Sequence, residues 1–292
     1  MTEPRAGTVK CLDSRGLHRM AYVEWGDPAN PRVLVCVHGL SRQGRDFDTL
    51  AQDLSSHYRV ICPDVVGRGK SDWLTDPMGY AIPGYVADMV TLVARLNVEQ
   101  VDWVGTSMGG LIGMGLAALP NTPVRKLVLN DVGPSIRVEA IQRIATYLGQ
   151  PLFWPTVDEA ASALWSVSKS FGPHTPEQWL ALTRPQLVPD VKAGVNGFKS
   201  HYDPAIAVPV RAATPEIMAA GEAMLWMAYD RITAPTLLLR GAESDLLSAE
   251  TAMAMTQRGP RARLAELPGV GHAPTLVAAD QRALVRDFLL AA

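Results

Sequence analysis

The sequence has few of the features that mark membrane-bound, secreted or nucleic-acid-binding proteins. It contains only three cysteines in 292 residues, and its formal net charge is −2. No apolar run approaches the roughly 18 residues that a membrane-spanning helix needs, and residues 1–7 lack the basic and apolar regions of a signal peptide. The nearly balanced charge also gives no electrostatic indication of binding to nucleic acid or to an anionic membrane surface. We therefore expect a cytoplasmic protein that neither binds nucleic acid nor inserts into membranes.

Patterns for disulfides, metals and phosphate cofactors are also missing. Cys11, Cys36 and Cys62 are odd in number and have no C-x-x-C spacing, which favours buried thiols over a disulfide framework. We find no H-x-H, H-E-x-x-H or clustered carboxylate pattern for a metal. The glycine-rich segment 64–72 lacks the spacing of a phosphate-binding loop. We expect no metal and no cofactor.

What the sequence does contain is an alternation of apolar runs with segments of helical periodicity. This alternation is typical of an α/β protein with a mostly parallel central sheet flanked by helices, whose ligands bind at the carboxyl ends of the strands. The strands expected in the first part of the chain are 20–25, 33–37, 58–62, 101–106 and 124–130, and the helices are 47–56, 85–96 and 107–119.

The rhythm changes after Gly133. From there to Tyr229 the sequence predicts helices separated by proline-containing breaks, with no convincing strand, and the alternation then resumes. We expect strands at 235–240 and 262–267 and helices at 249–257 and 281–290. The prediction is a core formed by residues 1–132 and 230–292, with a helical cap inserted at 133–229. The cap is rich in aromatic residues, and we expect it to contribute a substrate pocket. The pocket candidates are Trp154, Phe198, His201 and Trp226.

One serine has the local sequence of a nucleophile. Ser107 lies in Gly105-Thr106-Ser107-Met108-Gly109, between an apolar strand and a helix of small residues. In this G-x-S-x-G turn the glycines allow the strand and helix to pass close together, and the serine is exposed at the start of the helix. We expect Ser107 to be the catalytic nucleophile of an enzyme.

A serine nucleophile needs a histidine base and a carboxylate that orients it. His272 is the only one of the six histidines that follows the last expected strand. For the carboxylate, Asp245 gives the chain order Ser, Asp, His and is the favoured candidate. Asp131, which follows the strand 124–130, is the alternative, and Glu243 is a minor one.

Backbone N–H groups should stabilise the oxyanion. The N–H of Met108 directly follows the nucleophile, and the N–H of Leu40 lies in the loop after the strand 33–37. We expect His38 to hold this loop by hydrogen bonds rather than to transfer protons. Arg42 and Arg45 follow it, and one of them is a candidate for the entrance of the site.

These motifs together resemble the α/β-hydrolase superfamily along nearly the whole chain, in particular its capped bacterial serine carboxylesterases. The resemblance rests on His38-Gly39, the Asp64-to-Asp72 loop, the serine turn, Asp245 and Gly271-His272. It implies a triad of Ser107, Asp245 and His272, with Leu40 and Met108 as oxyanion donors. Asp245 departs from the usual spacing: it stands four residues after Gly241, whereas three is commoner, and Ser244 occupies the usual position. Asp131 therefore stays open as the acid.

The expected function is hydrolysis of carboxylic esters through an acyl-enzyme. The aromatic cap favours a small-molecule substrate that is a neutral, apolar ester of small to medium size. Aryl esters, short acyl esters and polyester fragments are examples. One alternative is a C–C bond hydrolase acting on a ring-fission product, with Arg42, Arg45 or His201 as polar anchor. Another, from a different class, is a ligand-binding or signalling receptor with the same fold.

Overall fold

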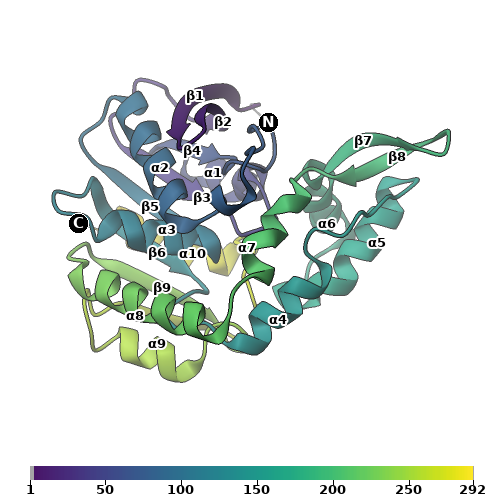
Figure 1. The fold of residues 1–292 in the computed structure, drawn as a ribbon. Helices are drawn as coiled ribbons and strands as arrows, with labels where there is room; N and C mark the ends of the chain where they lie inside the picture. Colours follow the sequence, from purple (N-terminus) through teal and green to yellow (C-terminus); the bar gives the residue numbers. More distant parts are fainter. Residues whose placement is uncertain (1–2, 292) are drawn as a thin grey trace.

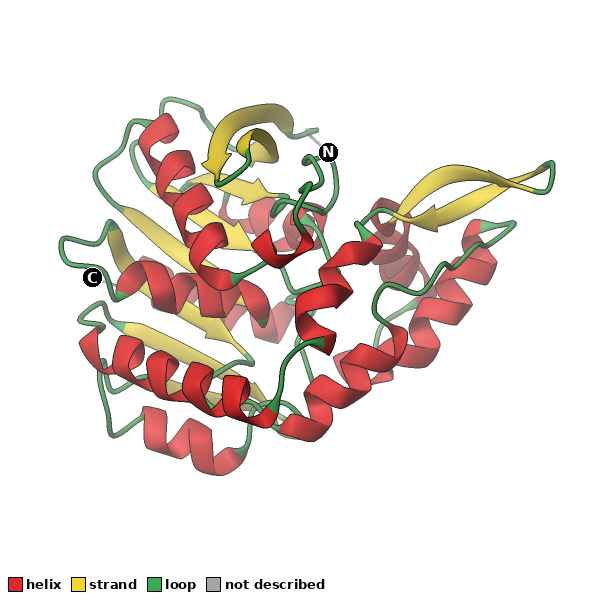
Figure 2. Ribbon diagram, in the orientation of Figure 1, coloured by secondary structure: helices red, strands yellow, loops and turns green. Residues whose placement is uncertain are grey.

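The computed structural model describes residues 3–291 and contains an eight-stranded sheet with helices on both faces (Figures 1 and 2). The strand order is β1-β2-β4-β3-β5-β6-β9-β10. Pairing is antiparallel for β1 with β2 and for β2 with β4, and parallel elsewhere. The strands are β1 (Arg5–Asp13), β2 (Gly16–Trp25), β3 (Val33–Val37), β4 (Arg59–Pro63), β5 (Val101–Thr106), β6 (Val124–Asn130), β9 (Thr236–Gly241) and β10 (Arg263–Leu267). The predicted α/β fold with a mostly parallel sheet is confirmed.

Both faces of the sheet are buried, and β3 shows how the sequence achieves this. Val33, Val35 and Val37 point into the core on one face, whereas Leu34 and Cys36 point into the core on the other. Side chains alternate between faces in a strand, so a continuous apolar run suits a strand covered on both sides. The covering helices are α1 (Asp48–Leu54), α2 (Ile82–Leu96), α3 (Met108–Ala117), α8 (Pro215–Arg231), α9 (Ala249–Met255) and α10 (Ala279–Leu290).

Between β6 and α8 the chain forms a segment that extends away from the sheet (Figure 1). It contains α4 (Val138–Tyr147), α5 (Val157–Ser168), α6 (Pro176–Thr183), α7 (Ala207–Arg211) and a hairpin of β7 (Leu187–Lys192) and β8 (Val195–Ser200). Short 3-10 helices connect elements throughout the chain: η1 (Gly44–Phe47), η2 (Pro77–Gly79), η3 (Lys169–Phe171), η4 (Arg184–Gln186) and η5 (Pro204–Ile206).

The hairpin corrects the expectation that this segment has no strand. Figure 2 shows it projecting from the molecule, and Val191 and Val195 near its turn are 63% and 51% exposed. A strand with no buried face lacks the alternation of apolar and polar residues that sequence patterns detect. Pro189 and Gly197 within the strands weaken the signal further.

Helix α8 lies in the predicted cap but packs beside the sheet. It contacts α3, and the Tyr229 hydroxyl donates a hydrogen bond of 2.7 Å to the carbonyl of Met255 in α9. It thus serves as the crossover helix between the parallel strands β6 and β9. The segment that stands away from the sheet therefore ends before Pro215, although the predicted insertion extends to residue 229.

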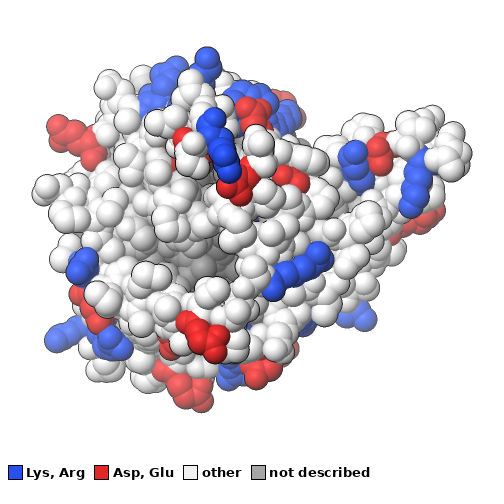
Figure 3. Space-filling view, viewed as in Figure 1, with Lys and Arg blue, Asp and Glu red and all other residues white. Residues whose placement is uncertain are grey.

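Other features agree with the composition. The three cysteines are buried and form no disulfide. Within residues 3–291, none of the helices is both long and apolar enough to cross a bilayer. On the face shown in Figure 3, acidic and basic side chains are scattered, with no large patch of either sign.

Candidate active site

Ser107 lies on a strained turn between β5 and α3. Its φ of 51° and ψ of −116° are unfavourable for a residue with a side chain. A Cβ atom at Gly105 would overlap the carbonyl of Gly109, and one at Gly109 would overlap the carbonyl of Val37. Both positions therefore require glycine, as the local sequence predicted.

Two hydrogen bonds connect Ser107 with a histidine and a carboxylate. The Ser107 Oγ lies 3.0 Å from His272 Nε2, and His272 Nδ1 lies 2.7 Å from Asp131 Oδ2. An ionised carboxylate can only accept, so His272 donates from Nδ1 and accepts the Ser107 hydroxyl proton at Nε2. These residues follow β5, β6 and β10, and all meet at the carboxyl ends of the parallel strands.

Asp131 is completely buried, and its carboxylate is surrounded by donors. Its Oδ1 accepts a hydrogen bond of 2.9 Å from the N–H of Gly241, and its Oδ2 accepts one of 2.7 Å from Ser244 Oγ as well as the bond from His272. Three donors compensate for the loss of hydration that burial imposes on the charge. Ser244, which the sequence analysis noted only for its spacing, thus supports the carboxylate.

The expected contact between Asp245 and His272 is not formed. Asp245 is instead held by Arg143 in α4, with distances of 2.7 Å and 3.1 Å from the guanidinium to its carboxylate oxygens. Its side chain is 47% exposed. The residue one position earlier, Ser244, turns toward the site, and this one-residue offset directs Asp245 outward. The geometry favours the alternative acid, Asp131.

His38 holds the loop beside Ser107. It is fully buried, its Nδ1 lies 2.7 Å from the carbonyl of Gly39, and its Nε2 accepts a hydrogen bond of 2.9 Å from the N–H of Val65. Burial lowers the pKa of His38 well below its usual value, so the ring is neutral. A Cβ at Gly39 would lie 3.7 Å from the Cβ of Ser107, which places this loop directly against the serine.

The N–H groups of Leu40 and Met108 donate to no other group among residues 3–291. Behind them lies Arg68, a fully buried arginine that sequence reasoning missed. Its Nε donates a hydrogen bond of 2.8 Å to the carbonyl of Leu40, and its Nη2 lies 3.6 Å from Met108 Sδ. Within the described chain it forms no ion pair with a carboxylate. Arg68 also donates to the carbonyl of Val66 and to the Tyr85 hydroxyl, so hydrogen bonds rather than a carboxylate hold its buried positive charge behind Leu40 and Met108.

A pocket of about 400 Å³ opens over Ser107 and His272. Of the four residues predicted to line it, Trp154 and His201 do so. Phe198 lines a separate, more open groove formed by Pro155 and residues of the hairpin, and Trp226 in α8 packs under the guanidinium of Arg258. Additional lining comes from residues that the sequence analysis did not select: Arg143, Ile144, Tyr147, Leu152, Leu164, Val167, Phe171 and Tyr202.

Comparisons with known proteins identify the family of this chain. A family profile described as the alpha/beta hydrolase family matches residues 34–287. The chain belongs to this family. A 3-hydroxybutyrate-oligomer hydrolase of Cupriavidus necator is 57% identical over 291 residues, which are 99% of each chain. The structure of an alpha/beta hydrolase from Novosphingobium aromaticivorans is similar with a TM-score of 0.84, at 37% identity and 99% coverage of both chains.

A more distant relative is named for a different substrate. A 2-(acetamidomethylene)succinate hydrolase of Mesorhizobium japonicum is 26% identical over 243 residues, covering 82% of this chain and 81% of that protein. The 57% relationship, by contrast, identifies this alpha/beta hydrolase as an enzyme that cleaves esters. The prediction of an ester hydrolase is confirmed at that level.

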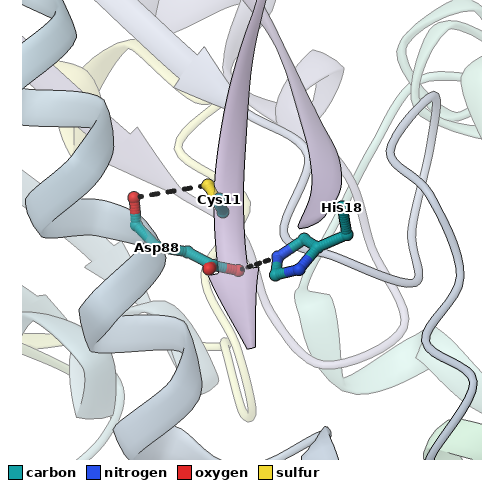
Figure 4. A group of neighbouring side chains, drawn as sticks. All are labelled: Cys11, His18 and Asp88. Atoms are coloured by element: carbon teal, nitrogen blue, oxygen red, sulfur yellow. Dashed lines mark hydrogen bonds and ion pairs between the residues drawn. The ribbon is translucent and has the colours of Figure 1, made fainter. Parts of the chain in front are cut away.

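A second cluster of polar side chains lies away from the pocket (Figure 4). His18 Nε2 lies 3.0 Å from Asp88 Oδ2, and the Cys11 thiol donates to the backbone carbonyl of Asp88 over 3.9 Å. Ligand-type atoms of the three residues lie within 4.8 Å of one another. Burial raises the pKa of Cys11 to about 12, which keeps the thiol protonated. The cluster thus joins the β1–β2 hairpin to α2 by hydrogen bonds.

Arg68 gives the first prediction. Replacing it with methionine removes the hydrogen bond to Leu40 and the buried charge, and a charged hydrogen bond contributes roughly 1.5–3 kcal/mol. We expect Arg68→Met to reduce kcat/KM for p-nitrophenyl butyrate about 10-fold to 100-fold, and to weaken inhibition by a boronic acid in parallel. Circular dichroism checks the fold. Full activity in a folded variant would exclude a role for Arg68 at this site.

His201 gives a prediction about stability. Its Nδ1 accepts a hydrogen bond of 2.7 Å from the N–H of Gly69, its Nε2 lies 2.9 Å from Gln186 Oε1, and burial lowers its pKa to about 3. Because the unfolded state binds a proton near pH 6.5, the stability that this ring contributes is lost as the pH falls below that value toward 3.

The variant His201→Gln removes this titration. Below about pH 6 we expect the free energy of unfolding of the wild type to fall more steeply than that of the variant, by up to about 1.4 kcal/mol per pH unit. Urea denaturation between pH 4.5 and 8 measures both slopes, and the upper end is the control because histidine is then neutral in either state. Parallel slopes would show that His201 does not titrate in this way.

Proposed function

We propose that this protein hydrolyses short linear esters of 3-hydroxybutyrate through an acyl-enzyme formed on Ser107. In the proposed mechanism His272 is the general base and acid, Asp131 orients it, and Leu40 and Met108 stabilise the oxyanion. The observation that carries the proposal is the unbroken hydrogen-bonded series from Ser107 to His272 to Asp131. The 3-hydroxybutyrate-oligomer hydrolase of Cupriavidus necator, 57% identical over 99% of both chains, supports the choice of substrate.

In the first half-reaction the Ser107 oxygen attacks the ester carbonyl while its proton passes to His272 Nε2. The imidazolium that forms is stabilised by the Asp131 carboxylate at Nδ1. His272 then donates the proton to the alkoxide of the leaving hydroxy acid, and the acyl group stays on Ser107. In the second half-reaction water attacks this ester, His272 accepts its proton, and Ser107 is regenerated.

Negative charge develops on the carbonyl oxygen during each attack. The two N–H groups of Leu40 and Met108 have no other acceptor among the described residues, so they are free to donate to it. Met108 is also the first residue of α3, where the helix dipole favours a negative charge. Preorganised donors of this type stabilise the transition state more than the ground state.

The pocket is compatible with a short oligomer. Its volume of about 400 Å³ falls in the range of roughly 300–1,000 Å³ that is usual for small-molecule sites. Apolar side chains such as Leu152 and Leu164 suit the methyl groups of the substrate, whereas Gln150 and Ser166 suit its ester carbonyls. We propose that the segment from residue 133 onward, with α4 and α5, is the cap that closes this pocket.

The mechanism makes a prediction for the two aspartates. We expect Ser107→Ala to abolish turnover of a 3-hydroxybutyrate trimer, and Asp131→Asn to lower kcat roughly 1,000-fold to 10,000-fold because the imidazole loses its orienting charge. We expect Asp245→Asn to lower kcat less than about tenfold, since a half-exposed ion pair contributes little. Product titration and thermal unfolding provide the measurements.

The opposite order of the aspartate variants would contradict the assignment. If Asp245→Asn abolished turnover while Asp131→Asn retained it, Asp245 would be the acid. If the wild type cleaved p-nitrophenyl esters but no 3-hydroxybutyrate oligomer, the mechanism would stand and the proposed substrate would fall.

A further inference from the structure

The charged residues of the pocket all have the same sign. Among the described residues that line it, two are arginines, Arg42 and Arg143, and none is aspartate or glutamate. A pocket for neutral esters does not require this arrangement. Guanidinium groups are, however, suited to bind carboxylates through two parallel hydrogen bonds.

Arg42 is already occupied inside the protein. Its Nε and Nη2 donate to the Asp46 carboxylate over 2.6 Å and 2.8 Å, and Gln186 donates to the same carboxylate over 2.9 Å. The side chain of Arg42 is only 14% exposed, and that of Asp46 is 18% exposed. A substrate carboxylate could take over the Nε and Nη2 donors of Arg42 only by breaking this shielded ion pair.

Arg143 is in a different situation. It lies in α4 on the same helical face as Tyr147, and Thr146 and Gln150 join it in lining the pocket. Its ion-pair partner, Asp245, lies in the loop that follows β9. The side chain of Arg143 is 38% exposed, and that of Asp245 is 47% exposed. Asp245 itself does not line the pocket. Because water competes for such a pair, another carboxylate can share or take over the guanidinium at small cost.

We propose that Arg143 binds the free carboxylate of the substrate, and that Asp245 is the internal carboxylate with which the substrate competes. The substrates are then linear hydroxy-acid esters with an ionised carboxyl end, rather than neutral esters. This inference rests on the proposed function, because a 3-hydroxybutyrate oligomer carries one such carboxylate. It differs from the expectation of a neutral substrate and gives Asp245 a role other than that of catalytic acid.

The test compares one ester in two charge states. For the 3-hydroxybutyrate dimer and its methyl ester, kcat/KM is measured with the wild type, Arg143→Gln, Arg143→Lys and Asp245→Asn. We expect the ratio of acid to methyl ester to fall roughly tenfold or more in Arg143→Gln, mainly through KM, and to recover in part in Arg143→Lys. In Asp245→Asn the ratio should rise several-fold because the competing carboxylate is gone, and added salt should lower the wild-type ratio.

The matched control is Arg258→Gln. Arg258, which follows α9, forms a similar pair with Asp230 in α8; the two side chains are 46% and 40% exposed, and neither residue lines the pocket. We expect this variant to keep the wild-type ratio. Equal losses for the acid and the methyl ester in Arg143→Gln would show a structural role and overturn the inference, as would a lower ratio in Asp245→Asn.

Failure of the proposed function gives a different result. If the wild type hydrolysed p-nitrophenyl butyrate but neither form of the dimer, the oligomer substrate would be wrong, and this inference would fall with it. If the wild type hydrolysed both forms of the dimer and Arg143→Gln had the same ratio of acid to methyl ester, the proposed function would stand. Only the carboxylate site would then be refuted.

Discussion

The buried carboxylate of Asp131 is the constraint on which the site depends. A charge without exposure to solvent is stable only when donors surround it, and here they come from two other parts of the chain: Gly241 and Ser244 at the end of β9, and His272 after β10. By satisfying one carboxylate, the chain brings the ends of β6, β9 and β10 into a fixed arrangement. The position of His272 relative to Ser107 follows from it.

The opposite side of Ser107 is organised by a second buried charge. Arg68 contacts Leu40 and Met108, and the neutral ring of His38 fixes the loop that contains Gly39. Ser107 and Asp131 both have positive φ angles, which for residues with side chains cost on the order of 1–3 kcal/mol each. This strain is tolerated because close packing around Ser107 and hydrogen bonds to Asp131 hold both turns in one conformation.

The parts of the site that could be predicted from the sequence are those encoded locally. Ser107 is recognisable because a close approach of strand and helix requires glycine on both sides, and His272 because it follows the last strand. The strands of the parallel sheet are recognisable because both faces are buried, as in β3. Each of these signals lies within a few consecutive residues.

The parts that could not be predicted depend on contacts between distant residues. Asp131 and Asp245 both follow a strand, and only the three-dimensional course of the β9 loop decides which of them reaches His272. Phe198 and Trp154 are joined by an antiparallel β-bridge, yet only Trp154 lines the pocket. Arg68 lies in a loop whose turns are formed by glycines on either side of it. Nothing in the local sequence reveals that the Arg68 side chain is buried behind Leu40 and Met108.

The assignment of Asp131 as the acid is tested most directly by observing the proton between His272 and Asp131. In a proton NMR spectrum we expect a low-field imidazole N–H resonance that belongs to His272 Nδ1, that shifts when a boronic acid reacts with Ser107, and that is retained in Asp245→Asn. Loss or displacement of this resonance in Asp131→Asn is the predicted result. A resonance that is unchanged in Asp131→Asn and lost in Asp245→Asn would contradict the central claim.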